Sequence, residues 1–224
     1  MIPLRDVIPS RTRPGVTIGL IAFNLLVYLF QAAMSARTAE SFLETFGVVP
    51  AQFSLVDVFT SMFVHAGFWH MAGNLLFLWI FGDNVEDRLG HGRFAVFYLA
   101  CGFVAAFAQT ALNPDSLIPM VGASGAIAGV MGAYLVLYPH SRVLMLFPFP
   151  PLVFELPAVF FLGLWFVMQF LNGIGSLPIF QADQISGGVA FWAHVAGFVA
   201  GLALVIPLRR RERMEVAWWD THAS

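Results

Sequence analysis

Apolar residues gather into six long segments, and polar residues collect in the stretches between them. Each segment has roughly the 17–25 residues that a helix needs to cross a bilayer. The second and fourth are the least regular, because both are short and begin with polar residues. The pattern predicts an all-α polytopic membrane protein, a six-transmembrane-helix bundle with spans over Val16–Ala33, His70–Leu89, Phe94–Leu112, Ala123–Tyr138, Glu155–Leu171 and Val189–Leu208.

Composition agrees with this class. Of the 224 residues, 59% are hydrophobic and 11% are charged, and the mean hydropathy is +0.80. These values exclude a soluble domain. The single cysteine, Cys101, lies in an apolar stretch, so neither a disulfide framework nor a cysteine metal site is expected within one chain.

The arginines predict an orientation. All eleven basic residues are arginine, and in a six-span arrangement ten of them fall on one side and Arg37 on the other. The positive-inside rule assigns the ten to the cytoplasm, together with both termini. We therefore expect a cytoplasmic N-terminal segment over residues 1–15, a membrane domain over 16–208 and a cytoplasmic tail over 209–224. A cleaved signal peptide is the alternative for the first segment, but about eighteen apolar residues are long for one and favour a retained span.

The longest outer loop, Met34–Phe68, carries signs of short helices. Phe42, Leu43 and Phe46 recur at helical spacing, and the run Ser54–Asp57 resembles a capping box that opens a helix. Such helices are suited to lie in the membrane interface.

A serine in the fourth segment is the first candidate for chemistry. From Ala123 to Tyr138 a helix covers only about 24 Å at about 1.5 Å per residue, less than a hydrocarbon core of about 30 Å. Its outer end is therefore expected below the membrane surface, where irregular backbone before Gly122 requires protein or a water-filled cavity around it. Ser124 is thus predicted at a helix N-terminus, where the dipole and unpaired N–H groups favour negative charge.

A histidine in the last segment, His194, is the second candidate, because ionisable side chains inside a span are costly and mark function by default. Two stripes of small residues suggest how it would meet the serine: Gly125, Gly129 and Gly132 in the fourth segment, and Gly197 and Gly201, on the face of His194, in the sixth. Close packing of these faces would bring His194 to Ser124 as the base that a serine nucleophile needs. Taken singly, each feature also has a structural interpretation: a serine bonded to its own helix, glycines that only pack helices, a histidine in a structural hydrogen bond.

A polar cluster lies at the start of the second segment. His70 and Asn74 share a helix face, and His65 lies five residues upstream of His70. A metal site is one interpretation, but no carboxylate or cysteine accompanies the pair, and five-residue spacing does not align two ligands on one face. The favoured interpretation is a set of hydrogen-bond donors aimed at an oxyanion beside Ser124. No metal or cofactor is expected.

Four motifs in order and at their spacing resemble the rhomboid family of intramembrane serine proteases: His65–Asn74, Gly82–Gly90, Gly122–Gly125 and His194–Gly201. The resemblance covers the second to sixth segments. It implies that Ser124 is the nucleophile and His194 its general base, a dyad without a third acid.

The resemblance also implies supporting roles. His65, Asn74 and the backbone N–H of Ser124 would form the oxyanion hole, beside Gly122 in the Gly122–Gly125 motif, with His70 as a supporting residue. Glu86 and Arg88 would tie the inner end of the second span to its neighbours. A gate for substrate would lie near the fifth span, whose outer end runs through Gly173–Ser176 into a loop that caps the site.

Two departures from the family pattern stand out. Some members carry an aromatic residue under the base histidine where this chain has Ala128, so His194 would be oriented by Trp192 or by tighter helix contact. Val56-Asp57 stand where the outer loop commonly carries a Trp-Arg pair, which bears on how that loop is anchored. Neither departure removes a reacting group.

The expected function is an intramembrane serine endopeptidase that cleaves transmembrane or juxtamembrane segments of membrane proteins. The alternatives are a non-proteolytic membrane-protein binding module of the same fold and a transporter with a histidine proton relay. The expected partners are transmembrane substrates and the lipid bilayer, with no nucleic acid. Eleven arginines and no lysine suggest a GC-rich genome, and so a bacterial inner membrane.

Overall fold

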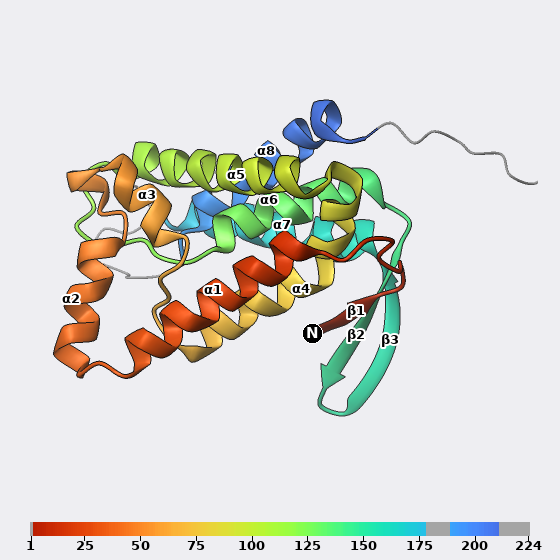
Figure 1. Cartoon of the computed structure of the whole chain (residues 1–224), viewed down its shortest axis with the longest axis horizontal. Helices are drawn as coiled ribbons and strands as arrows, with labels where there is room; N and C mark the ends of the chain where they lie inside the picture. Colours follow the sequence, from red (N-terminus) through yellow and green to blue (C-terminus); the bar gives the residue numbers. More distant parts are fainter. Residues whose placement is uncertain (1, 178–188, 211–224) are drawn as a thin grey trace, which may run out of the picture.

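The computed structural model describes residues 2–177 and 189–210. Six long helices lie at the six predicted segments, and their axes are roughly aligned through the molecule (Figure 1). By length and composition, four of them can cross a membrane: α1, α5, α7 and α8. Helix α6 is apolar but shorter, and α4 ends in a charged turn. The bounds are α1 Gly15–Ala32, α4 Phe68–Leu89, α5 His91–Leu112, α6 Ser124–Leu137, α7 Ala158–Gly175 and α8 Phe191–Leu208.

The long loop after α1 folds into the short helices α2 (Ala36–Phe46), η1 (Pro50–Gln52) and α3 (Leu55–Ser61). This confirms the prediction of short helices here. The Ser54 side chain caps α3 by accepting a hydrogen bond from the N–H of Val56 at 3.2 Å, which satisfies one of the donors that a helix start leaves unpaired.

The prediction of an all-α fold was wrong, because the described chain includes a three-stranded antiparallel sheet, β1 (Ile2–Asp6), β2 (Arg142–Pro148) and β3 (Pro151–Pro157), in that order. Strands β2 and β3 form a hairpin, and β1 pairs across a long sequence distance, with Ile2 opposite Leu146. The hairpin shortens the fifth helix, which begins at Ala158 and not at Glu155. The apolar run through β3 was read as the start of a span, although Pro157 cannot donate the backbone bond of a helix interior.

Helix α6 lies in the middle of the bundle and packs most closely on α8. A Cβ on Gly197 would collide with the carbonyl oxygen of Gly125, and one on Gly201 with that of Gly129. The two helices therefore approach backbone to backbone, as small residues allow. This confirms the predicted meeting of the two glycine faces.

Glu86 ties the end of α4 to the start of α1. Its buried carboxylate accepts hydrogen bonds from the N–H groups of Val16 and Thr17, at 2.9 and 2.8 Å, and from the Thr17 hydroxyl at 2.7 Å. His91 Nδ1 lies 2.5 Å from the same carboxylate. The predicted tying role of Glu86 is confirmed, and the negative charge suits the helix N-terminus that it caps.

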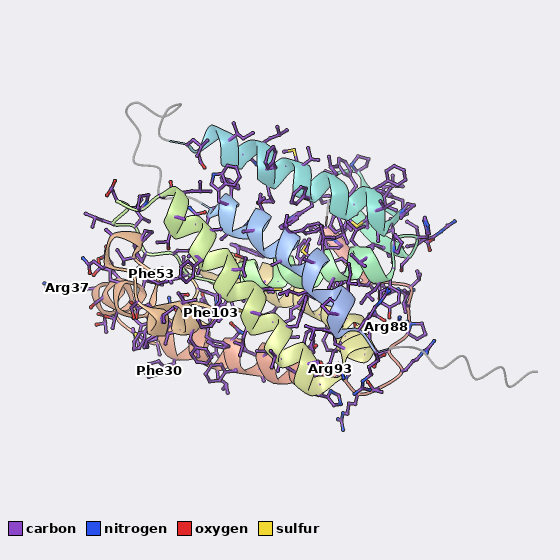
Figure 2. All side chains as sticks on the ribbon, turned by 90° about the horizontal axis from the view of Figure 1, so that it is seen from above. Phe30, Arg37, Phe53, Arg88, Arg93 and Phe103 are labelled. Atoms are coloured by element: carbon purple, nitrogen blue, oxygen red, sulfur yellow. The ribbon has the colours of Figure 1, made fainter. Side chains whose placement is uncertain are left out.

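Arginines from distant parts of the chain meet at one end of the bundle, which we call the arginine-rich end. There Arg210 donates its N–H to the carbonyl of Arg88 at 2.8 Å, Arg93 reaches the carbonyl of Leu208, and the Val7 N–H bonds to the Arg142 carbonyl. Arg37 lies at the opposite end from Arg88 and Arg93 (Figure 2). Of the predicted tail, Arg209 and Arg210 are described, whereas Arg211, Arg213 and Trp218-Trp219 lie outside the described residues.

Candidate active site

The segment before α6 positions Ser124. Gly122 adopts φ +115°, a conformation that favours glycine, and donates its N–H to the carbonyl of Ser61 at 2.8 Å. Two residues before it, Met120 exchanges backbone hydrogen bonds with Val48. This anchored turn starts α6 at Ser124, away from the arginine-rich end, so the Ser124 N–H has no acceptor within its own helix.

Ser124 and His194 meet directly. The Ser124 Oγ lies 2.7 Å from the His194 Nε2, although the two residues are 70 positions apart. His194 is 8% exposed. The close glycine contact between α6 and α8 brings its helix up to the start of α6. A hydroxyl that donates to an imidazole at this distance can lose its proton to the ring as it attacks an electrophile.

Helix α7 supports the other side of the His194 ring. The His194 Nδ1 lies 2.8 Å from the Gln169 Oε1, and the Trp165 ring lies beside the imidazole with a centroid distance of 5.8 Å and an interplanar angle of 36°. The expected orientation by Trp192 was wrong, because Trp192 makes an edge contact with Phe170 and covers Gly173. The expected tighter helix contact is present between α6 and α8, and Ala128 is fully buried.

Of the two upstream histidines, His70 lines the cavity that contains Ser124 and His65 does not. His70 and Asn74 line the cavity that contains Ser124, and a Cβ on Gly122 would come within 2.7 Å of the His70 Nε2 and 3.5 Å of the Asn74 Nδ2. His65 is fully buried, and its backbone carbonyl accepts a hydrogen bond from Gln31 of α1 at 2.7 Å. Both His65 ring nitrogens are buried without a hydrogen-bond partner among the described residues, and His65 is not among the residues that line the cavity. The five-residue spacing puts His65 in the loop before α4, facing the core.

Asn74 presents an unused donor to the cavity. Its Nδ2 is buried and has no acceptor among the described residues. A buried amide donor without a partner is costly unless something binds there. Its position beside Gly122 makes it suited to receive a negatively charged oxygen near Ser124.

A cavity of about 1080 Å³ surrounds these groups. It extends from Ser124 and His194 between α4 and α7, with Trp69 on one side and Trp165 on the other. It reaches the residues around Pro119 in the loop between α5 and α6. The volume is sufficient for an extended peptide segment. The predicted cavity beside Ser124 is thus present.

Metal chemistry gains no support from the side-chain arrangement in residues 2–177 and 189–210. Within these ranges, no three His, Cys, Asp or Glu side chains lie close enough together to hold an ion. The ring contact of His65 and His70, with centroids 5.2 Å apart, brings no carboxylate or thiol with it.

A family model described as the Rhomboid domain matches residues 52–211. The chain belongs to the rhomboid family. The match includes Ser124, His194, Asn74 and both upstream histidines. The rhomboid protease GluP of Bacillus subtilis (strain 168) is 29% identical over 199 residues, which cover 87% of this chain and 36% of that protein.

Two mitochondrial rhomboid relatives match shorter stretches. Rhomboid protein 1 of Saccharomyces cerevisiae is 34% identical over 43% of this chain and 30% of its own length. The human presenilin-associated rhomboid-like protein is 30% identical over 58% of this chain and 34% of its own length. The chain thus spans about a third of the length of the curated relatives it matches.

Reasoning from the sequence missed two neighbours of His194. Gln169 is a polar residue inside the apolar run Leu162–Leu171, and that isolation was itself a usable signal, since a polar residue in a span needs a partner. Trp165, one turn earlier, carries no such signal. The missed Gln109 likewise accepts a hydrogen bond from the Ala193 N–H at 3.2 Å, next to His194.

Proposed function

We propose that this rhomboid-family protein is an intramembrane serine endopeptidase that cleaves within or beside the membrane-spanning helix of another protein. The observation that carries the proposal is the 2.7 Å contact between Ser124 Oγ and His194 Nε2 at the wall of a large cavity. A serine hydroxyl and an imidazole in hydrogen-bond contact are the minimal apparatus for acyl transfer.

In the proposed reaction, the Ser124 Oγ attacks the scissile carbonyl carbon while the His194 Nε2 takes the hydroxyl proton. The carbonyl π pair moves onto its oxygen and forms a tetrahedral oxyanion. As the intermediate collapses, His194 returns the proton to the amine leaving group, and an acyl-enzyme remains on Ser124. A water molecule, deprotonated by His194, then hydrolyses this ester and restores the serine.

The oxyanion would be received by three donors: the Ser124 backbone N–H, the Asn74 Nδ2 and the His70 ring. Their support is the free first-turn N–H of α6, the unpartnered buried amide of Asn74 and the contact of both side chains with Gly122. We thus assign to His70 the part that the sequence resemblance gave to His65. Each such donor typically accounts for a factor of about 10²–10³ in kcat.

Substrate would enter laterally between α4 and α7. Toward the arginine-rich half these helices are closed by aromatic packing, because Phe161 stacks on Phe77 and Phe81 at 6.2 and 6.3 Å. In the other half, Trp69 and Trp165 line the cavity instead. A helical substrate hides its amides, so small or helix-breaking residues near the cleavage site would help it to unwind there.

We propose that all six long helices cross a bacterial inner membrane, with the arginine-rich end in the cytoplasm. The clustering of Arg88, Arg93, Arg142 and Arg210 at one end supports this orientation through the positive-inside rule. Ser124 would then face the outer half of the bilayer. The first 15 residues and residues 209–224 would form the cytoplasmic flanks of the membrane domain.

The test uses purified protein in liposomes with a single-span model substrate that carries glycine and alanine near the outer end of its span. Wild type is expected to release a fragment of defined size, and Ser124→Ala none. Ser41→Ala, which alters an exposed serine of α2, is the matched control and should cleave as wild type does. Cleavage that persists in Ser124→Ala would contradict the proposal. Stoichiometric binding of the substrate with no cleavage by wild type would support the binding module instead.

A further inference from the structure

The hydrogen bonds of His194 determine which ring nitrogen carries its proton. To accept the Ser124 hydroxyl proton, Nε2 must be unprotonated in the resting neutral ring, so Nδ1 carries the hydrogen. The Nδ1–H then needs an acceptor, and the Gln169 Oε1 lies 2.8 Å away. In that tautomer, Gln169 supplies the acceptor that the Nδ1–H requires.

The position of Gln169 on α7 suits this task. Gln169 and Trp165 are four residues apart, so they lie on the same helix face one turn from each other, and both contact His194. One side chain receives the ring proton and the other lies against the ring. Together they support the side of the His194 ring that faces away from Ser124.

We propose that Gln169 is a positioning residue, the third member of a Ser124–His194–Gln169 chain that fixes the tautomer and orientation of the base. The inference rests on the proposed function and extends it beyond a two-residue dyad. A neutral amide can orient an imidazole as a carboxylate does, without placing a net charge inside the bilayer, where a charge is costly. The consequence is that, within residues 2–177 and 189–210, no carboxylate contacts the imidazolium formed during the reaction.

Few of the other described groups around His194 can carry a charge, so the effect of a charge placed at position 169 can be measured. Helix α4 contributes the titratable ring of His70, whose charge acts on His194. From α5, α6 and α7 the described contacts are made by Gln109 at the neighbouring Ala193, by Ser124, and by Gln169 and Trp165, which carry no charge near neutral pH. A carboxylate at position 169 would therefore introduce a negative charge in contact with the ring, where the described part of the chain places none.

The experiment measures the rate of Ser124 labelling by a fluorescent fluorophosphonate as a function of pH, in the full chain and in detergent. Gln169→Leu removes the acceptor, and its expected labelling rate is about 10-fold to 100-fold below wild type, the range found when a metal-bound histidine loses its orienting partner. Gln169→Glu keeps an acceptor and adds charge. Its rate is expected near that of wild type at high pH, with the acid-side midpoint of the profile at least about one pH unit higher, because a carboxylate stabilises the protonated ring.

Met168→Leu changes the neighbouring exposed side chain and is the matched control, expected to behave as wild type. The inference is overturned if Gln169→Leu labels at the wild-type rate. It is also overturned if Gln169→Leu is slow only in proportion to lost thermal stability while Gln169→Glu leaves the midpoint unchanged, since that is a structural role. If wild type labels no faster than Ser124→Ala, the proposed function itself has failed, which is a distinguishable result.

Discussion

Gly197 of α8 lies against the carbonyl oxygen of Gly125 in α6, so closely that no side chain fits between the two helices. Gly125 follows the serine directly, and Gly197 is one turn beyond the histidine. The distance between Ser124 and His194 is therefore set by the backbone contact of two helices, with little dependence on long side chains. This one contact therefore affects both the packing of the two helices and the proposed chemistry.

Gly197→Ala should lower both the stability of the fold and the catalytic activity. The added methyl group must push α8 away from α6, because the obstacle is backbone and cannot rotate aside. We expect a loss of about 1–3 kcal/mol in the free energy of unfolding, typical of an overpacked core, together with a marked fall in activity. Thermal unfolding in detergent measures the first. Gly163→Ala, on α7 with nothing within 4 Å of the new methyl group, should lose neither, and equal behaviour of the two variants would contradict this account.

Glu86→Gln should destabilise the join between α4 and α1. The buried carboxylate accepts bonds from two backbone N–H groups and a hydroxyl, and a neutral amide offers one acceptor oxygen in place of two. We expect a loss of about 2 kcal/mol in unfolding free energy, the scale of a hydrogen bond to a charged group. In the comparison variant Glu155→Gln, the exposed pair with Arg142 at 3.1 Å is lost, which should cost less than about 1 kcal/mol. Chemical unfolding of both variants decides the order.

Alanine substitutions at His65 and at His70 should have different effects, the first on stability and the second on kcat. Asn74→Ala and His70→Ala remove groups that line the cavity beside Gly122, and each is expected to lower kcat by about 10²–10³ with the fold retained. His65→Ala instead empties a fully buried position away from the cavity lining, so its main effect should be on thermal stability. A large loss of kcat in a stable His65→Ala protein, with full activity in His70→Ala, would restore the original assignment.

Asp6, the last residue of β1, should make the free energy of unfolding depend on pH. Burial raises the pKa of this carboxyl from 3.8 to about 6, while the hydrogen bond from Tyr134 opposes the rise. The folded protein therefore binds a proton more tightly than the unfolded chain, so unfolding free energy falls as pH rises from about 4 to about 6 and is level above.

Asp6→Asn should remove this part of the pH dependence. The measurement is the thermal midpoint in detergent between pH 4 and pH 7.5, taken as the difference between variant and wild type. Asp115→Asn, at an exposed residue, is the control and should keep the wild-type profile. A difference that stays constant across the range would show that Asp6 does not titrate there.

The sequence was sufficient for the parts of the site that follow from spacing. The i, i+3 and i, i+4 glycines of the fourth and sixth segments predicted which helix faces meet, and the short fourth segment predicted where Ser124 lies. Both inferences use the fixed periodicity of a helix, so they need no knowledge of distant parts of the chain.

What the sequence did not reveal depends on contacts between distant residues. The sheet requires Ile2 to pair opposite Leu146, and no local sequence pattern predicts such a pairing. Gln169 meets His194 only because α7 packs beside α8 at one particular register. We assign the oxyanion role to His70 and not to His65 because α4 starts at Phe68, which places His70 on the cavity wall.

The central claim is that His194 activates Ser124 for attack on a carbonyl. The most direct test is labelling of the purified protein by a fluorescent fluorophosphonate, compared among wild type, Ser124→Ala and His194→Ala, with folding verified by thermal unfolding. The account predicts covalent labelling of wild type, none of Ser124→Ala and a rate reduced at least about 100-fold in His194→Ala. Equal labelling of wild type and Ser124→Ala, or a folded wild-type protein that does not react, would contradict it.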